Sequence, residues 1–132
     1  MHVKGLDHIN IIAADLDETA RFYESLLGLR VGRPPNVPAG FDGRWLHDAS
    51  DRPIIHVMPY NEDRHGKGAR SSMPTGSIDH IALACEDFDG TRRRCEELDV
   101  GHRVNDRAFG DLRQIFVTDP NNVVLELNFA GD

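Results

Sequence analysis

The sequence predicts an α+β fold built from two copies of one β-α-β-β-β module. An internal repeat, an apolar strand-like run at the start of each copy, and an acidic residue ahead of an amphipathic segment in each copy support this prediction. The chain has 132 residues, of which 39% are hydrophobic, which is the size and composition of one globular domain. We expect module 1 at about 5–59, a linker at 60–76 and module 2 at about 77–129.

The repeat is visible by position. Asp7-His8-Ile9 matches Asp79-His80-Ile81 at an offset of 72 residues. The same offset pairs Asp15 with Asp87, Asp17 with Asp89, Thr19 with Thr91, Arg21 with Arg93 and Leu26 with Leu98. Farther along, Trp45 falls on Phe116 at an offset of 71 and His56 falls on Glu126 at an offset of 70, a drift that small loop insertions explain.

Module 1 begins with an apolar run at 6–13 that predicts a half-buried strand. Asp15 is placed to cap the following helix, with Glu18 at the capping-box position and Gly28 at the end. The buried stripe of that helix is expected to be Leu16, Tyr23, Leu26 and Leu27. Strands are then expected at about 29–33, 42–48 and 53–59.

Module 2 repeats this order, with a strand at 78–85 and a helix capped by Asp87. Gly101 is expected to end the helix. The residues on its buried stripe are expected to be Phe88, Cys95 and Leu98. Strands follow at about 103–107, 111–119 and 122–129. The linker at 60–76 is polar and rich in glycine, so we expect it to be mobile and able to close over a ligand.

Charge and composition exclude several partners. The net charge of −7, with no basic run beyond Arg92–Arg94, argues against nucleic acid and anionic membranes. No apolar stretch approaches the roughly 20 residues that cross a bilayer, and no signal-peptide pattern begins the chain, so a cytoplasmic protein is expected. Cys85 and Cys95 are expected to be reduced, buried thiols without a catalytic role.

Strand alternation places four chemically distinctive residues on one kind of face. Because neighbouring side chains on a strand point to opposite faces, His8, His56, His80 and Glu126 are expected to face away from the helices. A lone strand histidine is commonly a hydrogen-bonded structural residue. Four such residues at equivalent repeat positions instead indicate a site for a divalent ion such as Ni, Zn, Co, Mn or Fe, with positions left for water or substrate.

The stretches "LDHINIIAADLDETARFYESLLGL", "IDHIALACEDF" and "FVTDPNNVVLELNF" resemble the vicinal oxygen chelate superfamily of glyoxalases, bleomycin resistance proteins and extradiol dioxygenases. The likeness extends from Gly5 to Phe129. It implies that the modules form an open, curved mixed β-sheet barrel around a divalent metal, commonly in a homodimer. It also implies that His8 and His80 are first-strand ligands, and that His56 and Glu126 are last-strand ligands. Whether modules pair within or between chains stays open.

Positions 56 and 116 bear on the reaction. Glyoxalase I enzymes typically carry glutamate at position 56 and the epimerases glutamine, whereas extradiol dioxygenases use only the other three sites. His56 differs from all three patterns. Phe116 occupies the position of the extradiol tyrosine, and His102 lies too far upstream to be the extradiol histidine, which counts against ring cleavage. Asn122 also departs from the glycine or proline of those enzymes.

The resemblance favours a glyoxalase-like lyase or isomerase that chelates two vicinal oxygens of a small substrate and stabilises an enediolate after proton abstraction. Glu126 is the expected general base, with His56 as the alternative. The residues expected to contact substrate are Asn10, Trp45, His47, Met58, Gln114 and Phe116, although Trp45 and Phe116 fit core aromatics equally well.

Two other functions stay open at this point. One is an Fe(II) extradiol-type dioxygenase. The other is a metal-free drug-binding resistance protein, and the set of four candidate metal ligands argues against it because a protein that only binds a drug does not need them. A further expectation concerns arginine: Arg33, Arg44 and Arg113 are candidates for an anionic group, although surface salt bridges are the commoner fate of arginine.

Overall fold

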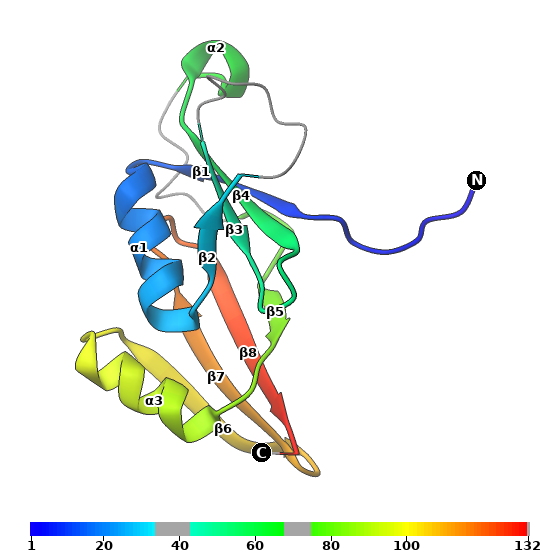
Figure 1. Ribbon diagram of the computed structural model, residues 1–132, viewed down its shortest axis with the longest axis vertical. Helices are drawn as coiled ribbons and strands as arrows, with labels where there is room; N and C mark the ends of the chain where they lie inside the picture. The colour runs from blue at the N-terminus through cyan, green and yellow to red at the C-terminus, as the bar shows by residue number, and fades with distance from the viewer. Residues whose placement is uncertain (34–42, 68–74, 132) are drawn as a thin grey trace. The chain divides into compact units, whose positions relative to one another are not determined.

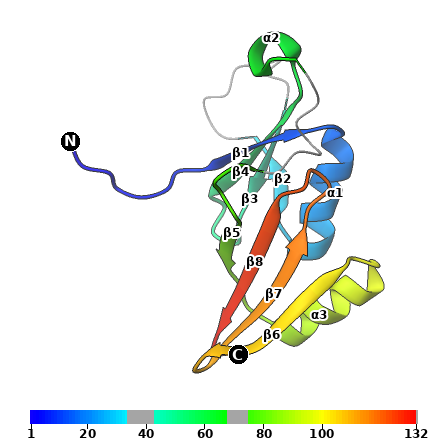
Figure 2. The same cartoon turned by 180° about the vertical axis from the view of Figure 1, so that it is seen from behind.

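The computed structural model describes residues 1–33, 43–67 and 75–131. The chain divides into two compact units, Met1–Ser71 (unit 1) and Ser72–Asp132 (unit 2). Each unit contains one four-stranded mixed sheet with a helix that contacts it (Figures 1 and 2). The expected α+β class and the two β-α-β-β-β modules are confirmed.

The unit 1 sheet has the strand order β1-β4-β3-β2. Its strands are β1 (Ile9–Ala13), β2 (Arg30–Gly32), β3 (Arg44–His47) and β4 (Pro53–Pro59). β1 is parallel to β4, and the other pairs are antiparallel. The first and last strands of the module are therefore neighbours, which sets Asn10 opposite His56 and Trp45 opposite His56.

Helix α1 (Leu16–Leu27) follows β1 and contacts β2, β3 and β4. Asp15 caps it as predicted, because its Oδ1 accepts hydrogen bonds of 2.9 Å from the backbone N–H groups of Asp17 and Glu18. Gly28 ends the helix in the left-handed region at φ 64°. The buried helix residues are Thr19, Ala20, Tyr23 and Leu26, while the expected Leu16 and Leu27 are half-buried.

The unit 2 sheet repeats this arrangement in the order β5-β8-β7-β6. Its strands are β5 (Ile81–Ala84), β6 (His102–Phe109), β7 (Leu112–Thr118) and β8 (Val124–Ala130). β5 is parallel to β8, with Ala82 opposite Glu126, and β7 sets Phe116 opposite Glu126 from the other side. Glu126 thus lies on a central strand of its sheet.

Helix α3 (Phe88–Glu97) is capped by Asp87, whose Oδ1 accepts a 2.9 Å hydrogen bond from Gly90 N. Phe88 and Cys95 are buried as expected. Two expectations are wrong: the helix ends before Gly101, at a C-cap on Leu98, and Leu98 is 40% exposed. The turn occurs early because Asp99 takes the left-handed conformation (φ 52°), which aspartate tolerates better than most residues.

The apolar core of each unit lies on the strand face opposite the last-strand candidates, His56 and Glu126. In unit 1 it includes Tyr23, Leu46, Ile55 and Val57. In unit 2 it includes Phe88, Ile115, Leu125, Leu127 and Phe129. Cys85 and Cys95 are free thiols, and burial raises the pKa of Cys85 to about 11, which suits an unreactive residue.

The expected linker contains local structure. Helix α2 (Glu62–His65) begins after Asn61, whose Oδ1 accepts a 3.1 Å hydrogen bond from Arg64 N. Residues 68–74 of the expected linker and residue 42 of the expected strand 42–48 lie outside the described residues. No helix in the described residues is both long and apolar enough to cross a membrane.

Candidate metal centre

The same aspartate–histidine contact occurs in both units. The Nδ1–H of His8 donates to Asp7 Oδ2 at 2.6 Å, and the Nδ1–H of His80 donates to Asp79 Oδ2 at 2.8 Å. A carboxylate at Nδ1 fixes the ring orientation and leaves Nε2 with its lone pair available to a metal. The repeat therefore duplicates both a histidine and the group that prepares it for ligation.

In unit 2 the second candidate ligand faces the first. His80 Nε2 lies 3.3 Å from Glu126 Oε2. Two donor atoms bound at about 2.1 Å to one ion are separated by about 3.0 Å in octahedral and about 3.4 Å in tetrahedral geometry. The spacing and chemistry of this pair therefore fit a divalent ion. The hydrogen bond to Asp79, together with the negative charge of Glu126, raises the pKa of His80.

A chain of side-chain amides holds the other oxygen of Glu126. Asn105 Nδ2 donates to Gln114 Oε1 at 3.0 Å, and Gln114 Nε2 donates to Asn128 Oδ1 at 2.9 Å. Asn128 Nδ2 then donates to Glu126 Oε1 at 2.8 Å. Every amide in this chain donates toward the carboxylate, so Oε1 is fixed by a hydrogen bond and Oε2 is directed toward His80.

In unit 1 the two candidate histidines surround an aromatic side chain. The ring centroids of His8 and Trp45 are 4.8 Å apart, and those of His8 and His56 are 6.3 Å apart. Trp45 stacks on His56 with 4.1 Å between centroids and an interplanar angle of 3°. His56 is only 5% exposed. His56 is therefore enclosed, whereas His8, with 35% of its side chain exposed, is as accessible as His80 in unit 2 at 36%.

A hydrogen bond also sets the tautomer of His56. The amide Nδ2 of Asn10 lies 2.9 Å from His56 Nδ1, and because this amide nitrogen only donates, Nδ1 accepts and the neutral ring carries its proton on Nε2. Burial lowers the pKa of His56, and the electrostatic influence of His8 and Arg64 lowers it further. Gly43 leaves room beside the ring, since a Cβ there would lie 2.9 Å from His56 Nε2.

The structure divides the expected substrate-contacting residues among several places. Asn10 and Trp45 contact His56, as described above. His47 lies apart, with Nδ1 3.3 Å from Arg30 Nη2 and 3.2 Å from Asp51 O. The regular pairing of β2 with β3 sets Arg30 opposite His47 and Gly32 opposite Trp45, so His47 and Trp45 share one face of the sheet. Within its unit, His47 thus belongs to the Arg30–Asp51 cluster.

The other residues expected to contact substrate, and the expected anion-binding arginines, have the following partners. Met58 Sδ lies 3.9 Å from Arg64 Nη1. Gln114 is part of the amide chain that ends at Glu126. Phe116 packs edge to face with His80, at 6.5 Å between ring centroids. Two of the expected anion-binding arginines have carboxylate partners: Arg44 pairs with Asp17 at 3.0 Å, and Arg113 pairs with Asp106 at 2.9 Å and with Asp89 at 3.4 Å.

Sequence reasoning missed several residues of the site. The carboxylates of Asp7 and Asp79 were visible in the repeated Asp-His pair, and their role could have been inferred from adjacency alone. Asn128 stands two residues after Glu126, and therefore on the same strand face. Asn105 reaches the site through cross-strand register, which no sequence pattern signalled.

Comparison with known proteins decides the family. The model of the "Glyoxalase/Bleomycin resistance protein/Dioxygenase superfamily" matches residues 5–127. The chain belongs to this superfamily. Its members are commonly metalloenzymes, which supports a metal-dependent enzyme here without defining the reaction.

Two curated relatives are similar to the chain. "Glyoxylase I 4" of Arabidopsis thaliana is 23% identical over 130 residues, covering 96% of this chain and 71% of the relative. "Ethylmalonyl-CoA/methylmalonyl-CoA epimerase" of Cereibacter sphaeroides is 30% identical over 99 residues, covering 75% of this chain and 72% of the relative. Their names point to different reactions within one superfamily.

Solved structures with low identity share the fold. The fosfomycin resistance protein FosX of Listeria monocytogenes has a TM-score of 0.70 at 20% identity, covering 98% of this chain and 95% of that chain. A glyoxalase family protein of Bacillus anthracis has a TM-score of 0.72 at 17% identity, covering 98% of each chain. A variant of the Listeria FosX was solved with Mn(II) and 1S,2S-dihydroxypropylphosphonic acid, at a TM-score of 0.71, 20% identity and coverage of 98% of this chain and 94% of that chain.

Proposed function

We propose that the protein is a divalent-metal-dependent lyase or isomerase of the glyoxalase type, acting on a small substrate with two vicinal oxygens. The main support is the pair formed by His80 Nε2 and Glu126 Oε2, 3.3 Å apart, together with the repeated Asp-His contact. Among the described residues no three His, Cys, Asp or Glu side chains gather closely enough to hold an ion. Each unit supplies a pair, and the proposal requires both pairs.

The proposed ligands are His8, His80 and Glu126, with His56 as the fourth. The first three present a lone pair in the observed hydrogen-bonding pattern. His56 can join them through Nε2 only if that atom gives up its proton, which the Asn10 amide opposes in its present orientation. Two or three imidazoles with one carboxylate suit Ni, Zn, Co, Mn or Fe.

The proposed chemistry is transfer of a carbon-bound proton. When bound, a divalent ion supplies a Lewis acid that polarises the two substrate oxygens and makes the adjacent C–H bond more acidic. Glu126 Oε2 accepts the proton after it has been released from its role as a ligand, and it can return the proton to a neighbouring atom of the substrate. Asn128 keeps Oε1 fixed meanwhile, so that the orientation of the base is maintained. His56 is the alternative base. Trp45 and Phe116 offer apolar surface to the carbon skeleton.

Elemental analysis of the full chain, purified anaerobically without a metal-binding tag, tests the proposal. We expect near-stoichiometric Ni, Zn, Co or Mn, and at least a tenfold weaker affinity in His80→Gln. His65→Gln is the matched control, because His65 lies in helix α2 and its Nδ1 accepts a hydrogen bond from Asn61 N. Turnover would then be sought with hemithioacetals of 2-oxoaldehydes and with acyl thioesters. A protein that binds no metal on titration contradicts the proposal and supports the metal-free drug-binding alternative.

A second candidate, an Fe(II) extradiol-type dioxygenase, is favoured by one observation. The Asn10 contact leaves His8, His80 and Glu126 as the available donors, which is the two-histidine, one-carboxylate set of non-haem iron oxygenases. Phe116, which has no acid or base function, counts against it. Stoichiometric iron with oxygen uptake on catechols would favour this candidate over proton transfer.

A further inference from the structure

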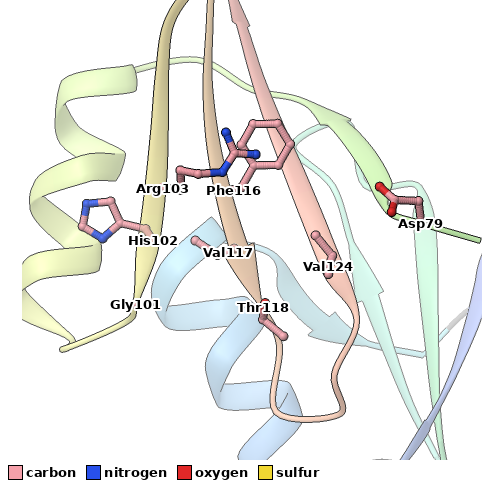
Figure 3. Close-up of a pocket in the computed structure, with 8 residues that line it drawn as sticks. All are labelled: Asp79, Gly101, His102, Arg103, Phe116, Val117, Thr118 and Val124. Atoms are coloured by element: carbon pink, nitrogen blue, oxygen red, sulfur yellow. The ribbon is translucent and has the colours of Figure 1, made fainter. Parts of the chain in front are cut away.

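Unit 2 contains a pocket of about 380 Å³ (Figure 3), and two of its lining residues, Asp79 and Phe116, contact His80. Its lining includes Asp79, Arg103, Phe116, Thr118 and Val124, all within the same unit. The register places Arg103 opposite Phe116, and Phe116 opposite Glu126. These three side chains therefore form a row across β6, β7 and β8 on one face of the sheet.

Arg103 is held in place by an aromatic ring. Its Cζ lies 4.0 Å from the centroid of Phe116, and Figure 3 shows the guanidinium group lying over the ring. Stacking occupies one face of the guanidinium and leaves its N–H groups, which point outward in the plane, able to donate to an oxyanion. The arrangement reduces the entropy that Arg103 would lose on binding a ligand.

Arg103 differs from Arg113 in its carboxylate partners among the described residues. In the parts of the chain that the structure describes, no aspartate or glutamate forms an ion pair with Arg103, whereas Arg113 of the same unit has two carboxylate partners. Asp79 is the acidic residue named in the pocket lining, and it is engaged by His80 Nδ1. Thr118 adds a hydroxyl donor, and Phe116 and Val124 add apolar surface.

We propose that this pocket binds an oxyanion, a phosphate or carboxylate group carried by the substrate, with Arg103 as its main contact. The inference rests on the proposed function, because it adds an anionic group to the substrate with vicinal oxygens. Phe116 lies between the two sites, with Arg103 over its face and His80 at 6.5 Å between ring centroids. A substrate whose anionic group and vicinal oxygens are a few bonds apart would reach both sites across Phe116.

Inorganic phosphate is the probe, titrated into metal-free full-length protein at constant ionic strength and followed by NMR of the arginine side-chain N–H groups. We expect saturable shifts at Arg103 Nε and at the backbone of Phe116 and Thr118. Arg103→Met keeps most of the aliphatic stem and should weaken phosphate binding at least tenfold. Arg94→Met, on the exposed side of α3, removes the same charge and should leave the dissociation constant unchanged.

A second substitution distinguishes a loss of phosphate binding from a loss of the folded state. Arg103→Lys retains the charge but loses the planar donor array, so its affinity should fall between those of the parent and Arg103→Met. Equal phosphate affinity in all three proteins, or shifts that also follow added chloride, would overturn the inference. If phosphate binds through Arg103 but the protein binds no metal, the anion site stands and the proposed function fails. If the protein binds metal but substitution of Arg103 leaves the phosphate affinity unchanged, only the proposed anion site is wrong.

Discussion

The two units use one backbone plan to prepare two different pairs of side chains. In both, an aspartate holds the histidine before the first strand, and an asparagine amide holds the candidate ligand on the last strand. The difference lies in the last-strand residue. His56 is buried, stacked on Trp45 and held with Nε2 protonated, whereas Glu126 is a carboxylate with one oxygen directed at His80.

This difference shows how duplication permits specialisation. The scaffold conserves the position of the last-strand residue, while its neighbours decide what that residue can do. An aromatic enclosure keeps an imidazole neutral in unit 1, and a chain of amides orients an anion in unit 2. Substitutions made at equivalent positions can therefore separate the contribution of the shared plan from that of the local surroundings.

The largest expected effect separates the two last-strand residues. Glu126→Gln keeps the shape and one oxygen but removes the proposed base, so turnover on a confirmed substrate should fall about 10²- to 10⁴-fold. His56→Gln should cost less, because Asn10 already limits the role of that ring. Steady-state kinetics with metal occupancy measured in parallel provides the comparison. Full turnover by metal-loaded Glu126→Gln would refute the assignment of the base.

The shared aspartate–histidine contact should contribute similarly to metal affinity in both units. Asp7→Asn and Asp79→Asn weaken the support at Nδ1, and each should reduce metal affinity by about 10- to 100-fold. Competition with a chromogenic chelator measures this loss. Asp99→Asn, in the turn after α3, is the control. A loss confined to one of the two variants would mean that only one unit contributes to the ion.

The two asparagines should differ in their effect on stability. Asn128→Ala removes a donor to a carboxylate and an acceptor for buried Gln114, with an expected cost of about 1.5–3 kcal/mol. Asn10→Ala removes a hydrogen bond between neutral groups, for about 0.5–1.5 kcal/mol. Urea denaturation of the metal-free proteins measures both free energies of unfolding. Equal costs would argue against the charge-assisted bond in unit 2.

The smallest expected effect is an opposite response to pH. The pKa of His56 is lowered, so its contribution favours the folded state at neutral pH and is lost as the pH falls below the ordinary value of about 6.5. The pKa of His80 is raised, so its contribution is present below that value and is lost as the pH rises through its folded-state pKa. NMR titration of the metal-free protein should show His56 protonating at lower pH than His80.

Much of this architecture could be predicted from the sequence. The repeat and the caps at Asp15 and Asp87 depend on local chemistry and are confirmed. The strands β1 and β5 begin at Ile9 and Ile81, so the alternation used to place His8 and His80 does not extend to those two residues. The contacts of His47 with Arg30 and Asp51 were harder to predict because they depend on the pairing of β2 with β3 and on the turn after β3. The amide chain and the Arg103 stack likewise depend on which residues face each other across strands, a relation set by tertiary register.

The parallel pairing of first and last strands has a consequence for folding. In the order β1-β4-β3-β2, β1 has β4 as its only neighbour within the unit 1 sheet, and β5 depends on β8 in the same way. A nascent chain that has reached only β3 therefore carries His8 directly before a strand, β1, that still has no partner in that sheet. Such long-range closure is slow compared with helix and hairpin formation. Neither unit can form its pair of candidate ligands before its last strand has joined the sheet. A partly synthesised chain would therefore expose single imidazoles, which bind a metal ion only weakly.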